Sequence, residues 1–310
     1  MELAGLANYG LFFLTFAGIY GILALGLNVQ WGLAGQFNIG IAGFFAIGAY
    51  ASAIMTTQPT PSHLGGFGWP ILAGLVVAVV CSGLVAVVIG AITVRLRTDY
   101  LAIATIGIAE TIRLVLKNEE WLTNGVRGIP GIPRSLEGGL GHGSLAMLAA
   151  VLIGLALVYW LLERARVSPW GRVMRAIREN EAAAAAAGKN ITRFRLEAFV
   201  LGSMTMGLAG GLYAHFFGFI GPEAFTPEFG TFLIWVMLIA GGSGNNRGAI
   251  AGAFGIWLIW TGSEMLTSLL PVQYVTQAGA IRLLLIGVLI QLVLILRPHG
   301  MIPDPDQSSR

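Results

Sequence analysis

The sequence predicts an all-α fold, a polytopic bundle of transmembrane helices. Hydrophobic residues make up 56% of the 310 residues and charged residues only 11%, whereas soluble domains usually carry about 25% charged residues. The chain also contains 44 glycines, which weaken helices in water but let helices pack closely in a membrane. Mean hydropathy is +0.78. We therefore expect residues 1–310 to form a single transmembrane domain.

Apolar runs indicate the individual helices, because a helix that crosses about 30 Å of hydrocarbon needs roughly 20 mostly apolar residues. The pattern predicts about nine spans, with about eight to ten compatible with it. In order they are 9–27, 33–55, 70–94, 100–116, 145–162, 196–217, 232–239 with its flanks, 249–270 and 280–296. The fourth run is the weakest, because Glu110 and Arg113 interrupt it. The seventh is short and ends in GGSGNN, so residues 241–247 form either a break or a re-entrant turn.

Charge asymmetry predicts the orientation, because cytoplasmic loops of membrane proteins carry an excess of Lys and Arg. In this count most basic positions fall on one side: Arg95, Arg97, the loop 163–195, Arg247 and Arg297. Lys117, Arg127 and Arg134 fall on the other side, accompanied by glutamates. We expect an outside N-terminus and a short cytoplasmic tail, 297–310.

The most distinctive segment is the basic loop 163–195, which holds 8 of the 18 Lys and Arg residues. Within it an Ala-rich run favours helix, and Ser168 followed by Pro169 is typical of a helix start. Arg172, Arg175 and Arg178 are spaced by three along one flank. A basic helix of this kind can lie on anionic lipid. The small alanine face favours the alternative, docking into a groove of another protein.

Enzyme motifs are absent from the sequence. The four histidines are scattered, Cys81 is the single cysteine, and neither a GxxxxGK[ST] phosphate loop nor a GxSxG nucleophile turn occurs. We therefore expect no catalytic residues, no metal, no bound cofactor and no nucleic-acid partner, and any ATP must be hydrolysed by another subunit.

Polar residues within apolar runs are the better candidates for function, because unsatisfied polar groups are costly in lipid. Gln36 and Asn38 lie at the start of the predicted second span, and Thr105 lies in the fourth. Glu110 and Arg113, three residues apart, share a helical face. They either line a path for a zwitterionic solute or form a structural ion pair near the outer end of the span.

Two glycine-rich segments carry a possible internal repeat. Shifting 32–47 by 209 positions onto 241–256 superposes identical residues, among them Gly35 on Gly244 and Gly43 on Gly252, with Gly32 on Gly241. Glycine-interrupted segments in both halves of a transporter often flank its substrate path. Simple helix packing through small residues is the alternative.

Four segments together resemble a known family, the M-type permease subunits of ATP-binding-cassette importers for branched-chain amino acids. They are GLNVQWGLAGQFNIGIAGFFAIGAY, RTDYLAIATIGIAETIRLVLKN with NGVRGIPGIP after it, SPWGRVMRAIRENEAAAAAAGKN with FRLEAFVLGSMTMGLAGGLYAHFFGFIGPEAF after it, and GGSGNNRGAIAGAFG. They cover most of the chain from residue 27 to residue 255.

The resemblance implies a coupling helix around 172–188 that docks on an ATPase, with Arg172, Arg175, Arg178, Glu181, Ala184 and Gly188 as its contact residues. It also implies a second related permease, two ATPase subunits, a substrate-binding protein outside the membrane, and the plasma (inner) membrane of a prokaryote as location. Two departures affect the geometry. Glu181 lies seven residues before Gly188, one more than in the usual EAA pattern, and Ala249 stands where the family often has proline.

Other functions remain open at this point. The same family includes permeases for urea, short amides and aromatic acids, which the sequence does not separate. An ion-coupled carrier is a more remote alternative, because such carriers usually show mid-span acidic residues, and here Glu110 already has Arg113 beside it.

Overall fold

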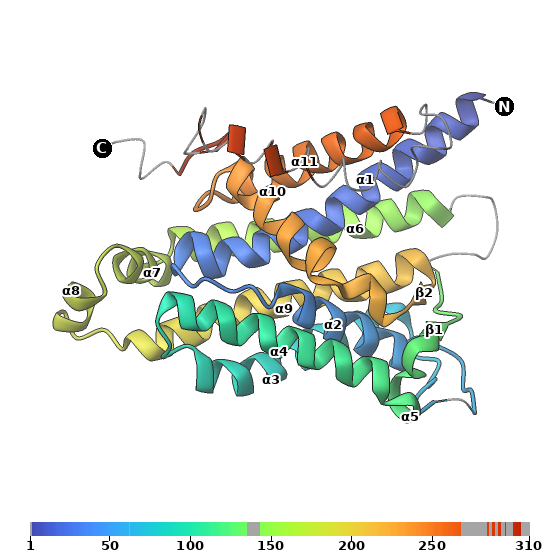
Figure 1. The fold of residues 1–310 in the computed structure, drawn as a ribbon, viewed down its shortest axis with the longest axis horizontal. Helices are drawn as coiled ribbons and strands as arrows, with labels where there is room; N and C mark the ends of the chain where they lie inside the picture. The colour runs from blue at the N-terminus through green and yellow to red at the C-terminus, as the bar shows by residue number, and fades with distance from the viewer. Residues whose placement is uncertain are drawn as a thin grey trace.

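The computed structural model describes residues 2–61, 63–134, 143–267 and 300–304, with a few isolated positions between 284 and 295. These residues form a bundle of long helices that run side by side (Figure 1). At one end lie two short helices, α7 and α8, and at the other a small two-stranded sheet of β1 and β2 (Figure 1). We call these the α7 end and the β1 end. The described residues are mostly helical, as the sequence predicts, and the short β1–β2 sheet departs from the all-α prediction.

One group of helices surrounds α1. This helix continues into a π-helical turn, η1, and packs on α6, α9, α10 and α11. The bounds are α1 Glu2–Leu27, η1 Asn28–Leu33, α6 Gly143–Val167, the π-helical turn η4 Glu228–Phe232, α10 Leu233–Gly241 and α11 Asn246–Thr267. The apolar side chains of α1 from Phe16 to Leu27 are almost all buried, so α1 lies at the centre of the bundle.

A second group consists of α2 (Ile41–Thr56), α3 (Ile71–Thr93) and α9 (Ile191–Phe217), which all pack on one another. Glycines bring their backbones together: a Cβ at Gly48 of α2 would overlap the backbone of Gly207 in α9. Such contacts through small residues replace the hydrophobic driving force that is missing between helices in lipid.

The β1 end is built from short elements around α4 (Thr98–Asn118). These are α5 Glu120–Thr123, the 3-10 turn η2 Gly125–Arg127, β1 Ile129–Pro130, β2 Phe219–Ile220 and the 3-10 turn η3 Pro222–Phe225. The strands pair antiparallel, Ile129 opposite Ile220. The loop after α2 lies here too, since the Leu64 amide donates to the Trp121 carbonyl at 2.6 Å.

The α7 end carries the basic loop. Its helices are α7, Pro169–Glu179, and α8, Glu181–Ala186. The predicted helix start is confirmed, because the Ser168 hydroxyl accepts from the Gly171 amide and Pro169 occupies the first turn. The single helical run expected from the sequence is wrong: it breaks at Asn180, whose extended backbone and side chain cap the start of α8.

Comparison with the predicted spans gives a mixed outcome. Four described helices, 8–33, 71–93, 145–167 and 191–217, are long and apolar enough to cross a membrane by length and composition. The fourth predicted span, α4, is not among them. The predicted start of the second span is wrong: residues 35–40 are not helical, and α2 begins at Ile41. The ninth predicted span, 280–296, lies mostly outside the described residues.

Several of the basic positions lie near the basic loop. Val94 and Leu96, which flank Arg95, line the same small cavity as Arg195, and the Arg247 guanidinium donates to the Tyr159 hydroxyl of α6 at 3.2 Å. Arg297 lies outside the described residues. Glu2 begins α1 at the β1 end, whereas Asp304 lies beside Arg178 at the α7 end (Figure 1).

Candidate functional site

The irregular segment 34–40, between η1 and α2, is held by side-chain hydrogen bonds. Asn38 is fully buried, and its amide donates to the Gln30 side-chain oxygen at 2.7 Å while its own oxygen accepts from the Gly40 amide at 2.7 Å. Gln36 donates to the Arg195 carbonyl at 2.8 Å, but its buried side-chain oxygen has no partner. Asn38 is thus a structural residue of this segment, and Gln36 retains one unused acceptor.

Thr105 of α4 closes the other side of this segment. Its hydroxyl accepts from the Ile39 amide at 3.0 Å. Two small cavities border the segment, one beside Ile39 and Glu110 and one beside Gln36 and Arg195, each of about 10 Å³. That is room for about one water molecule, so neither cavity admits an amino acid in this conformation.

The two glycine-rich segments of the predicted repeat lie against each other. The Asn28 side chain, from η1, donates to the Asn246 side-chain oxygen at 2.9 Å and accepts from the Gly244 amide at 2.8 Å. A Cβ at Gly32 would lie only 2.5 Å from the Gly244 nitrogen. The repeat positions Gly35 and Gly244 both have positive φ, +67° and +91°, a conformation that favours glycine.

The remaining predicted glycines lie at close helix contacts. Gly43 places α2 against Ala109 of α4, and a Cβ added there would lie 3.0 Å from the Ala109 Cα. Gly241, the last residue of α10, touches Gly248 and Gly252 of α11. These glycines therefore set the spacing of the helices around segment 34–40.

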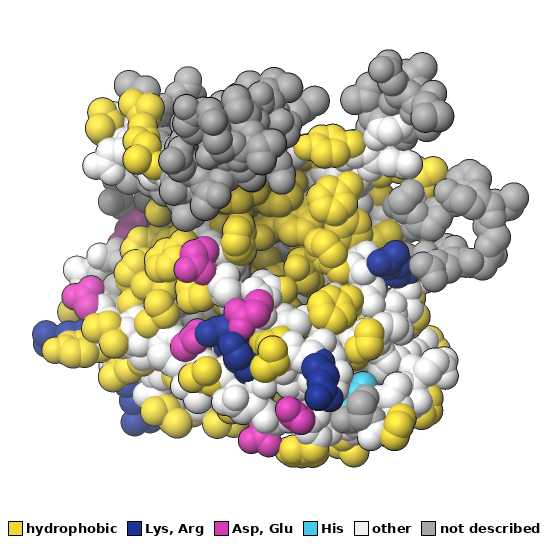
Figure 2. Space-filling model, turned by 45° about the vertical axis from the view of Figure 1, so that its right-hand side comes forward, with side chains coloured by type: hydrophobic (Ala, Val, Ile, Leu, Met, Phe, Trp, Pro, Cys, Tyr) yellow, Lys and Arg dark blue, Asp and Glu magenta, His cyan; other side chains and the backbone are white. Residues whose placement is uncertain are grey.

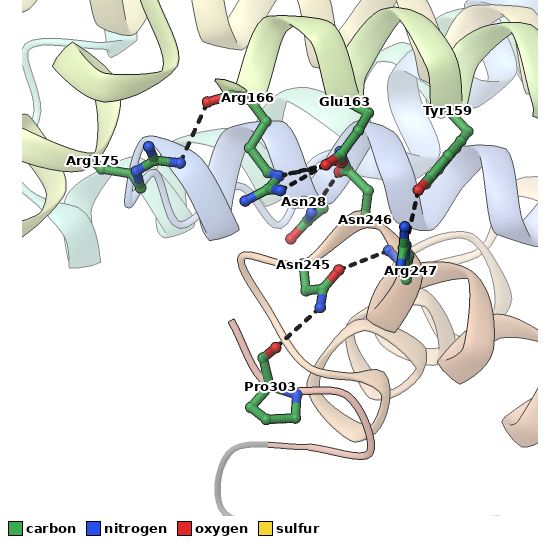
Figure 3. A network of polar contacts seen from close by, with 9 residues as sticks. All are labelled: Asn28, Tyr159, Glu163, Arg166, Arg175, Asn245, Asn246, Arg247 and Pro303. Atoms are coloured by element: carbon green, nitrogen blue, oxygen red, sulfur yellow. Dashed lines mark hydrogen bonds and ion pairs between the residues drawn. The ribbon is translucent and has the colours of Figure 1, made fainter. Parts of the chain in front are cut away.

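A polar network joins this region to the α7 end (Figure 3). The Asn246 amide donates to the Glu163 carboxylate at 2.8 Å, and Glu163 pairs with Arg166 at 2.6 Å. Arg175 of α7 donates in turn to the Arg166 carbonyl at 3.3 Å. The network thus runs from the glycine-rich turn at 244–246 through α6 to α7.

The three arginines of α7 have different surroundings. Arg172 is exposed and donates to the Val167 carbonyl at 3.3 Å. Arg175 is half-buried against α6. Arg178 points into the protein, donates to the Gly32 carbonyl and pairs with Asp304 at 3.3 Å. The spacing of three placed them on one flank, but only Arg172 presents its side chain mainly to the outside.

The other predicted coupling residues lie on or after α8. Glu181 pairs with Arg195 at 2.9 Å, which ties α8 to the start of α9. Ala184 is buried, whereas its neighbours Ala182, Ala183, Ala185 and Ala186 are exposed. Gly188 is exposed with φ +76°. The exposed alanine face therefore consists of the neighbours of Ala184.

Glu110 and Arg113 form the predicted internal ion pair, at 2.5 Å. Arg113 also reaches Glu223 of η3 at 3.3 Å, and Lys117 donates to Glu223 at 2.8 Å. The Lys117 ammonium holds the pKa of the Glu223 carboxyl below its usual range. Acidic and basic side chains lie together among hydrophobic ones on the face that Figure 2 turns forward. The cluster ties α4 to η3, which supports the structural interpretation of the pair.

Sequence reasoning missed four residues that the structure brings to this region: Asn28, Gln30, Asn246 and Asp304. Asn28 and Gln30 follow the long apolar run of α1. Two amide side chains next to such a run are a sequence signal for buried polar contacts, because unpaired polar groups are costly in a membrane. Asp304 offered none, since the PDPD sequence around it is typical of an exposed tail.

Comparison with known proteins decides the family. Residues 9–294 match the model of the branched-chain amino acid transport system permease component. The chain belongs to this permease family. Two relatives are high-affinity branched-chain amino acid transport system permease proteins named LivM. The protein of Salmonella typhimurium is 33% identical to this chain and that of Escherichia coli is 32% identical. Each alignment covers 93% of this chain and 69% of the relative. A probable LivM of Methanocaldococcus jannaschii is 29% identical, covering 94% and 92%.

The permease is also similar to the LivH proteins, at 24% identity for that of Salmonella typhimurium over 94% of both chains. No solved structure matches the permease. Family membership and the apolar helices make it a multi-pass membrane protein and a transport subunit. Among the described residues no group of His, Cys, Asp and Glu is arranged to hold a metal ion.

Proposed function

We propose that this permease is the membrane subunit of an ATP-driven importer that moves branched-chain amino acids into a prokaryotic cell, with ATP hydrolysed by separate subunits. The observation that carries the proposal is α7–α8, a compact helical unit with an exposed alanine face at the end where the basic residues gather. Such a unit offers a soluble ATPase subunit a docking surface. Family membership and the names of the LivM relatives, which are branched-chain amino acid permeases, support the substrate class.

The partners follow from this function. We propose a second, related permease, two ATPase subunits on the α7 end and a substrate-binding protein at the β1 end. The α7 end then faces the cytoplasm, consistent with its excess of Lys and Arg. The proposed ATPase contacts are Arg172, Glu181, Gly188 and the exposed alanines. Arg175, Arg178 and Ala184 lie beneath them and support the surface.

The proposed substrate path passes between the two glycine-rich segments, 32–48 and 241–255. Asn38, Thr105 and Glu110 border it, and Gln36 contributes the unused acceptor described above. The half-buried aromatic rings of Trp31 and Phe37, 5.4 Å apart at their centroids, offer an apolar surface to an apolar substrate side chain. Both bordering cavities have room for about one water molecule, so neither admits the substrate in the described conformation.

Uptake by the reconstituted complex tests the function. We expect radiolabelled leucine, isoleucine or valine to enter proteoliposomes only when ATP and the binding protein are present. Accumulation of urea, a short amide or an aromatic acid in place of leucine would reassign the substrate. Uptake that persists without ATP and stops when an ion gradient is dissipated would identify a carrier and refute the proposal.

The first mutational prediction concerns the exposed alanine face of α8. We expect Ala182→Arg and Ala185→Arg to reduce co-purification of the ATPase at least about tenfold, a loss of about 1.4 kcal/mol, because each places a bulky charge in a packed interface. Ala182→Ser, which keeps the side chain small, is the matched control. Affinity purification of the tagged permease gives the measurement, and normal ATPase recovery with both arginine variants would contradict the docking site.

The second prediction concerns topology. In a Cys81→Ser background we expect Gln58→Cys, in the loop at the β1 end, to react with a membrane-impermeant maleimide in intact cells. Ala182→Cys at the α7 end should react only after the membrane is permeabilised. The reverse pattern would invert the proposed orientation.

A further inference from the structure

Arg178 differs from the rest of the exposed flank of α7, because its guanidinium is inserted into the junction of three segments. The side chain is only 16% exposed. One terminal nitrogen donates to the Gly32 carbonyl of η1, and the other pairs with the Asp304 carboxylate. Asp304 itself is 1% exposed. A planar guanidinium suits this geometry, since its nitrogens address two acceptors in different directions at once.

The two glycine-rich turns, one at Gly35 and one at Gly244, both lie against the Arg178 side chain. A Cβ added at Gly35 would meet the Arg178 Cγ at 3.1 Å, and one added at Gly244 would meet the Arg178 Nη1 at 3.2 Å. These two positions are the ones that the predicted repeat superposes, and both have positive φ. Arg178 therefore lies against both turns.

The chain segment 300–304 completes the junction. The Met301 and Ile302 amides donate to the Ala240 and Gly241 carbonyls, each at 2.9 Å, and Asn245 donates to the Pro303 carbonyl at 3.0 Å. The last carbonyls of a helix have no partner within the helix. Segment 300–304 therefore covers the end of α10 and the 242–245 turn, and the Asp304–Arg178 pair connects that cover to α7.

We propose that Arg178 is a positioning residue that transfers displacement of α7 to both glycine-rich turns, through the Gly32 carbonyl on one side and through Asp304 and segment 300–304 on the other. The proposal rests on the proposed function, in which a partner ATPase moves α7 and the turns flank the substrate path. It assigns to Arg178 a transmitting role distinct from docking. Because packed junctions have discrete arrangements and deform little, a shift of α7 must move both turns or break these contacts.

Arg178→Gln tests the link in the complete importer, with Arg193→Gln as the matched control. Both substitutions remove one positive charge from the basic loop 163–195, but Arg193 is exposed and pairs with Glu197 on its own helix, away from the junction. For Arg178→Gln we expect normal ATPase co-purification and basal ATP hydrolysis, with leucine transported per ATP reduced at least about tenfold. Arg193→Gln should leave that ratio within about twofold. An unchanged ratio in Arg178→Gln, or a loss of co-purification equal to that of Ala182→Arg, would overturn the transmitting role.

Hydrogen exchange on the permease alone separates this proposal from the proposed function. Arg178→Gln should speed exchange at the Met301 and Ile302 amides at least about tenfold, because a partly buried charge-assisted hydrogen bond typically contributes that much protection. Arg178→Lys keeps the charge without the two-pronged donor and should show an intermediate rate. Unchanged exchange in Arg178→Gln refutes the link. Absence of ATP-driven uptake in the wild-type complex would instead refute the proposed function and leave this result standing.

Discussion

Replacing Gly48 with leucine is expected to abolish the folded permease. Gly48 of α2 faces Gly207 of α9, and an added Cβ would overlap the Gly207 carbonyl oxygen and lie 2.5 Å from its Cα. The overlap is with backbone, so no side chain can rotate to relieve it. Inserting atoms into a packed core typically costs about 1–3 kcal/mol. Separating α2 from α9 should exceed that range, because the two helices also meet at Phe44–Phe199 and Ser52–His215.

Gly107→Leu in α4 provides the matched control. It makes the same substitution in a helical glycine, but a Cβ there has nothing within 4 Å. Size-exclusion chromatography of fluorescently tagged permease in detergent, followed by thermal unfolding, measures both variants. We expect a wild-type elution profile for Gly107→Leu and aggregate for Gly48→Leu. A monodisperse Gly48→Leu protein with an unchanged melting temperature would show that α2 and α9 are not packed as described.

The helices themselves were largely predictable, because hydrophobic length is a local property of the chain. The run 70–94 became α3, Ile71–Thr93, and the run 196–217 became the larger part of α9, Ile191–Phe217. The Glu110–Arg113 pair was predictable for the same reason, since both residues lie on one turn of one helix. Features that depend on a few neighbouring residues were within reach of the sequence.

The irregular segment 34–40 was not predictable, because distant residues impose it. The sequence GQFNIG is compatible with the start of a span, and the helix is excluded by Asn38 bonding to Gln30 and Ile39 bonding to Thr105. The burial of Ala184 and the inward direction of Arg178 depend in the same way on where α7 and α8 rest on the bundle. Equal spacing along a helix shows which residues share a flank, but not which of them another segment covers.

The second large effect is expected at Asn38, where alanine should destabilise the permease far more than alanine at Gln36. Asn38→Ala leaves the Gln30 side-chain oxygen and the Gly40 amide without the partners described here, and each buried orphan typically costs about 1–3 kcal/mol. Gln36→Ala removes one hydrogen bond to the Arg195 carbonyl but also removes an oxygen that was already unpartnered. Its net cost should stay below about 1 kcal/mol. Thermal unfolding in detergent measures the difference.

Uptake kinetics then separate structure from transport at the same two positions. A residue that only supports the fold changes the amount of active permease, whereas a path residue changes the rate per folded molecule or the preference among substrates. We expect Gln36→Ala, with near-normal stability, to alter leucine uptake per folded permease, because the unpartnered Gln36 oxygen is a buried acceptor and Gln36 lines the small cavity beside Arg195. Asn38→Ala should lose uptake in proportion to lost folded protein. If Gln36→Ala leaves both rate and preference unchanged, segment 34–40 is a structural support and the path runs elsewhere in the bundle.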